Sequence, residues 1–334
     1  MAEKISAQIE PAGVLEGHGD MVTCIIAGHS NSQEDEDAIL ISGSRDKTLI
    51  IWKLDYKATE GQCGRPWRCL TGHNHFVSDL TISNDNAYII SSSWDKTMRL
   101  WDLRNGACRK QFIAHNKEVF TTTFSTDNRQ IFSGGADKAM YLWNTLAECK
   151  MVSSNPPNPA HDHKDWVSKI RFSQSNKTQY YASVGWDGRL KIWNGIFKNI
   201  ASIKAHESYI NALDISRNGL YIATGGKDQI VKMWDYHDLK QPYAEYKCES
   251  IINSLVFNTT YQWLAVATDT GIKIFDIATD SQNLFAQIKI QNEDEKKKAP
   301  RPMSICWSAN GRRIYAGCSD GLIRVYNVNV KTSM

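Results

Sequence analysis

Five segments of the 334-residue chain each supply a histidine, a serine or threonine, an aspartate and a tryptophan, always in this order. We call each set a tetrad. A hydrolase uses the same side-chain types as base, nucleophile and orienting acid, so one hypothesis is an enzyme built on one tetrad. The five tetrads are His18, Ser42, Asp46 and Trp52; His73, Ser91, Asp95 and Trp101; His115, Ser133, Asp137 and Trp143; His163 (or His161), Ser183, Asp187 and Trp193; and His206, Thr224, Asp228 and Trp234.

The repetition of the tetrads favours a structural role over a catalytic one, because a catalytic site is built once and not five times. A chain of hydrogen bonds from the indole N–H through hydroxyl and imidazole to carboxylate would satisfy polar groups buried between strands. It would also fix the turn that carries the histidine to the turn that carries the aspartate. We therefore predict that the tetrads are scaffold and that the chain is no enzyme, with no cofactor and no small-molecule substrate.

The tetrads belong to a repeat with a period of about 40 to 50 residues, which has Gly-His near its start and Trp-Asp at its end. This is the signature of a β-propeller blade. The sixth and seventh copies lack the histidine and replace the tryptophan by Phe or Tyr. We predict an all-β, seven-bladed WD-repeat β-propeller that spans residues 1–334 as one domain. The seven blade-ending aromatics are Trp52, Trp101, Trp143, Trp193, Trp234, Phe275 and Tyr326.

Short alternating runs bounded by Asn, Asp or Gly give each repeat four predicted strands. An open ring would leave two unpaired strand edges. We therefore expect residues from Ile9 to Leu15, which precede the first repeat, to pair with the strand from Leu322 to Tyr326. Insertions at 31–37, 155–165 and 291–302 are expected to be loops.

Composition describes an ordinary soluble protein, with 42% hydrophobic residues, 22% charged residues and a net charge of +3. The eight cysteines form no Cys-x-x-Cys pair, so we expect buried free thiols and no metal site. The N-terminus lacks the apolar segment of a signal peptide, and no long uncharged apolar run occurs. We expect a cytoplasmic protein without membrane insertion.

Basic residues gather in the predicted turns that hold the tetrad aspartates of the first three blades. We call Arg45, Lys47, Lys96 and Lys138 the basic crescent, and we expect Arg68 to extend it. A local cluster of Arg and Lys suits contact with a phosphate backbone, so these five residues are predicted to bind RNA. The alternative is that Lys after the turn aspartate is common in such repeats for reasons local to the turn.

Aromatic residues are predicted on the same face. Trp94 and Trp186 directly precede tetrad aspartates, and Phe76, Trp166 and Tyr209 each stand just before the first strand of a blade. Exposed aromatic side chains on a ring face are candidate anchors for a bound protein segment. The alternative is that they cap the ends of the blade cores.

Several blade-specific segments resemble one family, that of the receptor for activated C kinase. They are GHNHFVSDLTIS, SRDKTLIIWKL, SWDKTMRLWDL, FSTDNRQIFSGGADKAMYLWNTL, GWDGRLKIWN, TGGKDQIVKMWD and IINSLVFNTTYQWLAVAT. The resemblance implies a non-catalytic scaffold on the small (40S-type) ribosomal subunit, in contact with ribosomal RNA and ribosomal proteins. It also implies recruitment of signalling proteins, such as protein kinase C, and of translation factors. In this family the SRDKT turn approaches the RNA backbone, and the matching residues are Arg45 and Lys47.

A ribosome-independent signalling adaptor, similar to a G-protein β subunit, is the main alternative. That class normally carries a long N-terminal coiled-coil helix. Here only 17 residues precede His18, and they include a proline and glycines. This segment favours the ribosomal scaffold.

Overall fold

The computed structural model describes residues 5–28, 39–55, 63–113, 115–153, 162–175, 179–278, 284–290 and 298–332, and within these ranges every long regular element is a β-strand. The strands are β1 (Ile5–Leu15), β2 (Val22–Ala27), β3 (Ile39–Ser44), β4 (Leu49–Leu54), β5 (Gly64–Leu70), β6 (Val77–Ile82), β7 (Tyr88–Ser93), β8 (Thr97–Asp102), β9 (Cys108–Ile113), β10 (Val119–Phe124), β11 (Gln130–Gly135), β12 (Met140–Asn144), β13 (Cys149–Val152), β14 (Val167–Phe172), β15 (Tyr181–Gly185), β16 (Arg189–Asn194), β17 (Lys198–Lys204), β18 (Ile210–Ile215), β19 (Tyr221–Gly226), β20 (Ile230–Asp235), β21 (Ala244–Lys247), β22 (Ile252–Phe257), β23 (Trp263–Thr268), β24 (Gly271–Asp276), β25 (Leu284–Ile288), β26 (Pro302–Trp307), β27 (Arg313–Cys318) and β28 (Ile323–Thr332).

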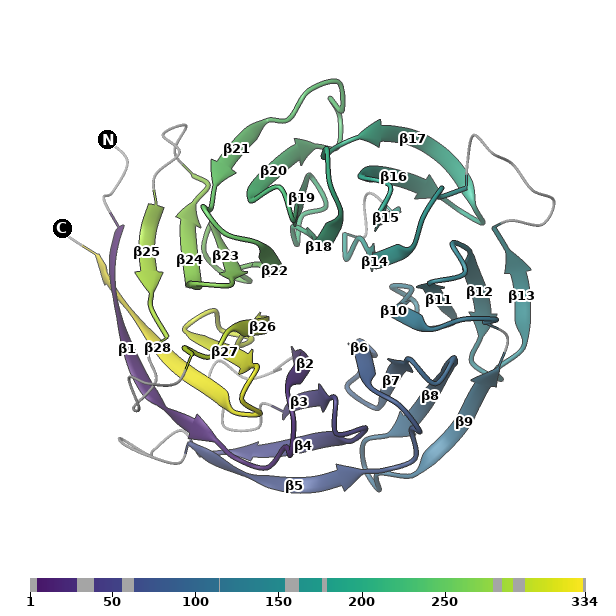
Figure 1. Ribbon diagram of the computed structural model, residues 1–334, viewed down its shortest axis with the longest axis horizontal. Coiled ribbons are helices and arrows are strands. Elements are labelled where there is room, and N and C mark those ends of the chain that lie inside the picture. The colour runs from purple at the N-terminus through teal and green to yellow at the C-terminus, as the bar shows by residue number, and fades with distance from the viewer. Residues whose placement is uncertain are drawn as a thin grey trace.

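The strands form four-stranded antiparallel sheets arranged as the seven blades of a propeller (Figure 1). Blades 1 to 6 take four consecutive strands each, from β2–β5 to β22–β25, and blade 7 has the order β1-β28-β27-β26. The first strand of each meander lies nearest the centre of the ring (Figure 1). The predicted seven-bladed, all-β fold is confirmed.

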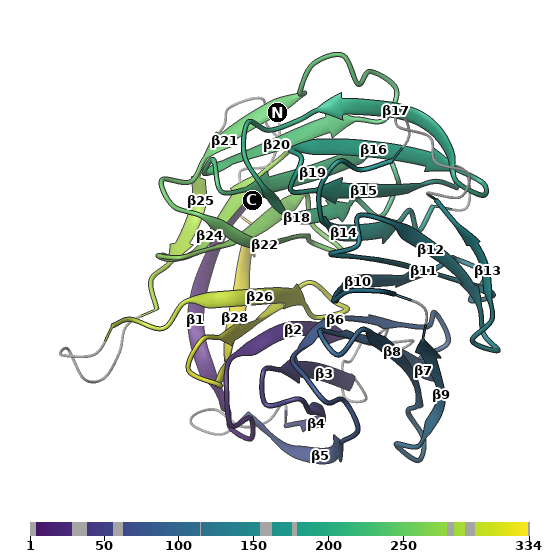
Figure 2. The same ribbon diagram turned by 45° about the vertical axis from the view of Figure 1, so that its right-hand side comes forward.

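The two ends of the described chain meet in blade 7. Strand β1 pairs with β28 in an antiparallel ladder from Ile5 opposite Thr332 to Leu15 opposite Ile323, and the two strands run side by side in Figure 2. The ladder contains the predicted pairing and continues beyond Tyr326 toward the C-terminus. Leu15 is fully buried, so β1 contributes to the core as well as to the sheet. The ring therefore has no open gap at this position.

A β-bulge recurs at the same place in all seven blades, between the first and second strands. In blade 1 the register shifts between Val22 and Cys24, which releases Thr23 from the ladder. A bulge redirects the side chain of the released residue. The seven released residues are Thr23, Ser78, Phe120, Ser168, Asn211, Asn253 and Met303.

Five of the released residues donate a hydrogen bond to a backbone carbonyl of the next blade. The bonds run from Thr23 to Val77, from Ser78 to Val119, from Ser168 to Ile210, from Asn211 to Ile252 and from Asn253 to Pro302. The two exceptions are Phe120 and Met303, which cannot donate. There the next residue takes over: Thr121 accepts from the Ile170 amide at 3.0 Å, and Ser304 from the Ile25 amide at 3.1 Å. Every blade is thus bonded to its neighbour.

The hydrophobic core consists of clusters that lie between neighbouring blades. The cluster between blades 7 and 1, for example, joins Leu15 and Tyr315 to Trp52. Burying side chains of this size contributes about 2–3 kcal/mol each. Each blade therefore depends on both neighbours for its stability.

Some sequence-based expectations concern other parts of the chain. The loops predicted at 31–37 and 155–161, the residue His161 and the first part of the loop at 291–302 lie outside the described residues. In the described part, no helix is long and apolar enough to cross a membrane.

Candidate interaction surface

The structure brings the four side chains of each tetrad into one hydrogen-bonded chain. In blade 2 the Trp101 indole N–H donates to Ser91 Oγ at 2.8 Å. Ser91 Oγ lies 2.7 Å from His73 Nε2, and His73 Nδ1 lies 2.8 Å from Asp95 Oδ2. Because a carboxylate only accepts, His73 Nδ1 carries the hydrogen and donates it to Asp95. Every polar atom of the chain is thereby satisfied.

The other four tetrads repeat this geometry, with His163 rather than His161 in blade 4. Their His–Asp distances are 2.8 Å at His18, 2.9 Å at His115, 3.0 Å at His163 and 2.6 Å at His206. The hydroxyls of Ser42, Ser91, Ser133, Ser183 and Thr224 belong to residues with no exposed surface. A nucleophile at these positions could not reach a substrate, so the tetrads connect strands and do no chemistry.

The tetrads hold their carboxylates ionised. Burial alone would raise the pKa of Asp187, but the hydrogen bond and charge of His163 outweigh it and lower the pKa to about 2. Burial lowers the pKa of His163 below its usual 6.5, although the hydrogen bond and the charge of Asp187 raise it. The pKa values of Asp46 and Asp95 are also well below the ordinary range, because hydrogen bonds from their histidine and threonine partners exceed the effect of burial.

A second repeated bond places all seven aspartate turns on one rim of the ring. In blade 2 the amide of Trp94, in the turn between β7 and β8, donates to the carbonyl of Phe76, just before β6, at 3.0 Å. The equivalent donors and acceptors in the other blades are Arg45 and Met21, Ala136 and Glu118, Trp186 and Trp166, Lys227 and Tyr209, Asp269 and Ile251, and Ser319 and Arg301. The basic crescent and the predicted aromatic anchors therefore share this rim.

The lysines of the crescent occupy a backbone conformation that favours glycine. Lys47, Lys96 and Lys138 have φ angles of 71°, 69° and 67°, and Lys47 N donates to Ser44 O to close the turn. A non-glycine residue at positive φ costs on the order of 1–3 kcal/mol. Blade 4 places Gly188 at this position. Blade 5 places Gln229, with a φ of 67°, at the same position. The turn therefore accepts long side chains as well as glycine, and its geometry alone does not select lysine.

The crescent residues differ in the exposure of their side chains and in the contacts of their charged groups. Lys47 and Lys96 are exposed, and the ammonium of Lys138, also exposed, donates to the Lys164 carbonyl at 3.0 Å. Arg45 is half-buried, with its guanidinium 4.8 Å from the ring centre of Phe76.

Arg68 does not extend the crescent. Its guanidinium donates to the carbonyls of Arg104 and Asn105, in the loop after β8. That loop is at the opposite end of β8 from the Asp95 turn. Arg68 also stacks on Trp67 at 4.6 Å. The expected extension toward Arg68 was wrong, because hydrogen bonds to this loop hold its guanidinium away from the crescent.

The predicted anchors form one continuous line of ring contacts, which also includes a residue that we did not predict, Phe120. We call Phe76, Trp94, Phe120, Trp166, Trp186 and Tyr209 the aromatic arc. Successive ring centres lie 5.6, 5.9, 5.2, 4.2 and 4.6 Å apart from Phe76 to Tyr209. The only sequence signal for Phe120 is that it stands where five blades carry Thr, Ser or Asn.

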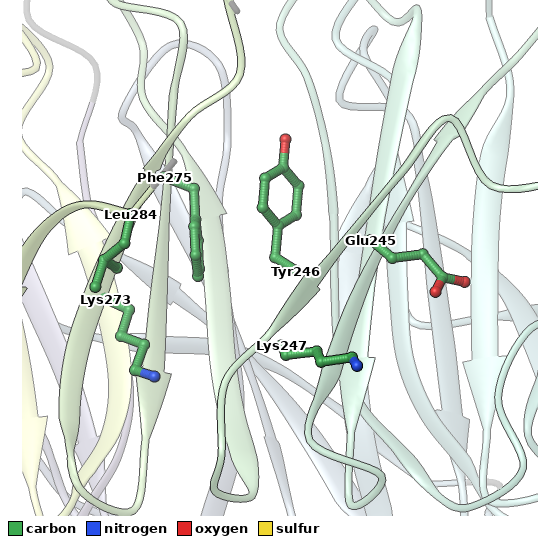
Figure 3. A pocket seen from close by; sticks show the side chains of 6 residues that line it. All are labelled: Glu245, Tyr246, Lys247, Lys273, Phe275 and Leu284. Atoms are coloured by element: carbon green, nitrogen blue, oxygen red, sulfur yellow. The ribbon is translucent and has the colours of Figure 1, made fainter. Parts of the chain in front are cut away.

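Blade 6 lacks a tetrad, and a cavity of about 390 Å³ lies beside its outer strands. Figure 3 shows Phe275, which replaces the usual tryptophan, beside Tyr246 of blade 5, with their ring centres 4.7 Å apart. Cys248 stands at the histidine position, three residues before Ile251, and the Lys273 ammonium donates to its carbonyl at 2.9 Å. A buried lysine thus holds the loop that a histidine holds in blades 1 to 5.

The first strands of all seven blades line a central channel. It contains a buried carboxylate shared by three blades. Arg171 binds Asp79 through two nitrogens at 2.9 and 3.1 Å, and Lys169 through its ammonium at 3.0 Å. Thr121 Oγ1 also donates to Asp79 at 2.8 Å. Burial would raise the pKa of Asp79, but the charges of Arg171 and Lys169 keep it well below normal. This network reinforces the junction of blades 3 and 4, where Phe120 provides no hydrogen bond.

A second channel carboxylate, that of Asp214, behaves in the opposite way. Burial raises its pKa to about 6, although the Phe257 amide, at 2.8 Å, and the charge of Arg171 both lower it. Asp214 therefore binds its proton more tightly in the folded protein than in the unfolded chain. Its contribution to stability is present below pH 4 and is lost as the pH rises through 6.

We expect Asp214→Asn to raise the free energy of unfolding by about 1–2 kcal/mol at pH 7.5 and to leave it almost unchanged near pH 4. The amide keeps an acceptor for Phe257 N and carries no charge to desolvate. Urea unfolding of both proteins at the two pH values measures the difference. A variant less stable than the parent at pH 7.5 would show that the attraction to Arg171 outweighs the cost of burial.

The cysteines are free thiols, as predicted, but only five of them are buried. Cys24, Cys63, Cys248, Cys306 and Cys318 are buried, and burial raises the pKa of Cys248 to about 11. Three others, Cys69, Cys108 and Cys149, are exposed. They lie on β5, β9 and β13, the outer strands of blades 1 to 3, where a side chain faces solvent. Within the described ranges, no group of His, Cys, Asp and Glu could hold a metal ion.

Comparison with known proteins agrees with this architecture. The chain matches the family model described as "WD domain, G-beta repeat" over residues 9–53, 64–102, 106–144, 158–194, 197–235, 240–276 and 298–327. It is 41% identical over 333 residues to the small ribosomal subunit protein RACK1 of Caenorhabditis elegans, which covers 98% of this chain and 99% of that protein. It is 43% identical over 326 residues to the cross-pathway control WD-repeat protein 2 of Flammulina velutipes, covering 97% and 99%. The small ribosomal subunit protein RACK1y of Oryza sativa is 40% identical over 95% of both chains.

Proposed function

Because this chain belongs to the RACK1 family of WD-repeat β-propellers, we propose that it is a non-catalytic scaffold bound to the small ribosomal subunit through its basic crescent. Relatives from an animal and from a plant, each similar over nearly the whole chain, are named as proteins of that subunit. These names favour the ribosomal scaffold over an adaptor similar to a G-protein β subunit.

The observation that supports the RNA contact is the placement of the crescent on one rim of the ring. A repeated backbone bond holds the turns of blades 1 to 3 on this rim, and the three lysines of these turns are exposed. Lys47, Lys96 and Lys138 present their ammonium groups on one rim, and Arg45 lies beside them in blade 1. Phosphate groups of ribosomal RNA are the partner that this charge suits.

The remaining rim provides room for other partners. Protein kinases, such as protein kinase C, and translation factors are the classes that the family resemblance suggests. The aromatic arc runs from blade 2 to blade 5, beside the crescent. A protein held on the ribosome by one part of its rim could recruit these partners with the rest.

The dependence of subunit binding on salt concentration tests the phosphate contacts. Four contacts give a slope of about −3 in a plot of log affinity against log salt, so we expect roughly a fiftyfold loss between about 50 and 200 mM. Sedimentation of the purified protein with small ribosomal subunits in sucrose gradients of rising salt measures this slope. A flat profile would overturn the phosphate contact, and failure to sediment with subunits at low salt would overturn the proposed function.

A further inference from the structure

The aromatic arc leaves a large apolar surface in water. Trp94 is 38% exposed and Tyr209 39% exposed, and the other four rings are half-buried. Contiguous exposed aromatic surface of this kind marks a contact site. The path along the ring centres is on the order of 25 Å, the span of about eight extended residues.

Phe120 shows that the arc is more than a cap on the blade cores. It occupies the bulge position whose side chain bonds to the next blade in five other blades. Blade 3 lacks that bond, and Thr121 takes over its role. In place of that bond, Phe120 provides a ring that contacts Trp94 on one side and Trp166 on the other, with ring centres 5.9 and 5.2 Å apart. Without Phe120 the arc would be interrupted between blades 2 and 4.

The charged groups that lie over the rings of the arc are cations, although Asp165 and Glu207 stand in the loops beside it. Arg45 lies 4.8 Å from the ring centre of Phe76 at one end, and Lys227 lies 5.2 Å from that of Tyr209 at the other. Lys96, Lys138 and Lys164 are exposed in the turns alongside. Complementarity between the two surfaces therefore requires a negatively charged partner.

The packing of the rings favours a polypeptide over RNA. A platform for bases needs ring faces that are open to solvent. Here cations cover a face of the rings at both ends, and Trp186 stacks on Tyr209 at 18° between ring planes, with Trp166 only 4.2 Å from Trp186. Apolar side chains of a peptide can fill the spaces along such a line without intercalating.

From these observations we infer that the aromatic arc binds an extended acidic polypeptide segment that carries apolar or aromatic side chains. The inference rests on the adaptor role proposed above, since it gives the chemistry of a recruited partner. The acidic groups of the segment would meet Lys164 and Lys227, which lie outside the crescent, and its apolar side chains would cover the rings of Trp94 and Tyr209.

Phage display tests this inference. Random peptides of about twelve residues are selected for binding to the intact protein. We expect enrichment of peptides that combine Asp or Glu with Trp, Phe or Leu. Fluorescence anisotropy with the enriched peptides should then show at least about tenfold weaker binding to Trp94→Ala and to Phe120→Ser. Lys227→Gln should weaken binding a few fold and reduce its salt dependence.

Trp67→Ala is the matched control, because Trp67 is a 50% exposed tryptophan on β5 that also stacks with an arginine but lies outside the arc. It should leave peptide binding unchanged. Phe120→Ser introduces the residue type that blades 2 and 4 carry at this position, and Trp94 is a surface residue, so both variants should fold; thermal melting checks this.

Several outcomes would overturn the inference: no enrichment, enrichment of basic peptides, or peptides that bind Trp94→Ala as well as the parent protein. Tighter binding of a single-stranded RNA of about ten nucleotides, lost in the same variants, would identify the arc as an RNA site instead. Sedimentation with ribosomal subunits separates the two proposals. Phe120→Ser should still sediment, and the peptides should still bind if the crescent proves to have no role.

Discussion

His73→Ala will lower the free energy of unfolding by about 3–5 kcal/mol. The substitution empties a buried site and leaves Asp95 and Ser91 without the imidazole that lies 2.8 and 2.7 Å from them. It also releases the loop before β6 from the turn between β7 and β8. Denaturant unfolding followed by tryptophan fluorescence measures the loss.

His75→Ala is the control for this prediction. His75 has the same residue type and lies in the same loop, but it is exposed. Its Nδ1 accepts from the Phe76 amide at 2.8 Å, and its ring contacts those of Phe76 and Trp94. We expect a change within about 0.5 kcal/mol. Equal stability of His73→Ala and the parent protein would contradict a scaffold role for the tetrads, and loss of an enzymatic turnover in a fully folded variant would support the catalytic hypothesis.

Arg45→Glu combined with Lys47→Glu will release the protein from small ribosomal subunits, with affinity reduced about a hundredfold or more. The double change removes two cations from the crescent and adds two anions that repel phosphate. Folding should be retained, because Lys47 is exposed and Arg45 contacts only the face of Phe76 among aromatic rings. Sedimentation with purified subunits at low salt measures the release.

The matched control is Lys198→Glu combined with Lys204→Glu, which makes the same change in net charge on β17 of blade 4. Both lysines are exposed on an outer strand, far along the ring from blade 1. This variant should sediment like the parent protein. Release of both variants to the same degree would mean that net charge, and not the crescent, determines binding.

A milder change at one position separates folding from binding. Lys47→Gly relieves the positive φ of 71° and should raise stability by about 0.5–1 kcal/mol, while it weakens binding to subunits several fold. A glycine variant that gains stability and loses affinity would show that the strain is kept for the sake of the ammonium group.

The repeat and its tetrads could be predicted from the sequence because blades 1 to 5 each carry their own buried hydrogen-bond chain, built from the same residue types. The closure of the ring could be predicted because two open strand edges are costly. Its length could not, since nothing in the segment after Tyr326 distinguishes a continuing strand from a tail.

The candidate site was less accessible to prediction. The crescent could be predicted from the residues of the aspartate turns. Five members of the arc could be predicted from their positions next to these turns or just before the first strand of a blade. Phe120 did not, because its position becomes informative only once the bulge register is known. Arg68 was misplaced because the sequence does not show that its side chain reaches the loop after β8. The channel network of Asp79 and Arg171 joins residues of blades 2 and 4, and no repeat period predicts contacts of that kind.

The pairing of β1 with β28 has a consequence for how the molecule is made. Leu15 cannot meet Ile323 until about 300 further residues have been synthesised, which takes on the order of 15–60 s at ordinary translation rates. During that time β1 has no partner strand, and its backbone groups are unpaired on the growing chain. The final shape can form only after β28 has left the exit tunnel, so a nascent chain of this protein needs protection from aggregation until that strand has emerged.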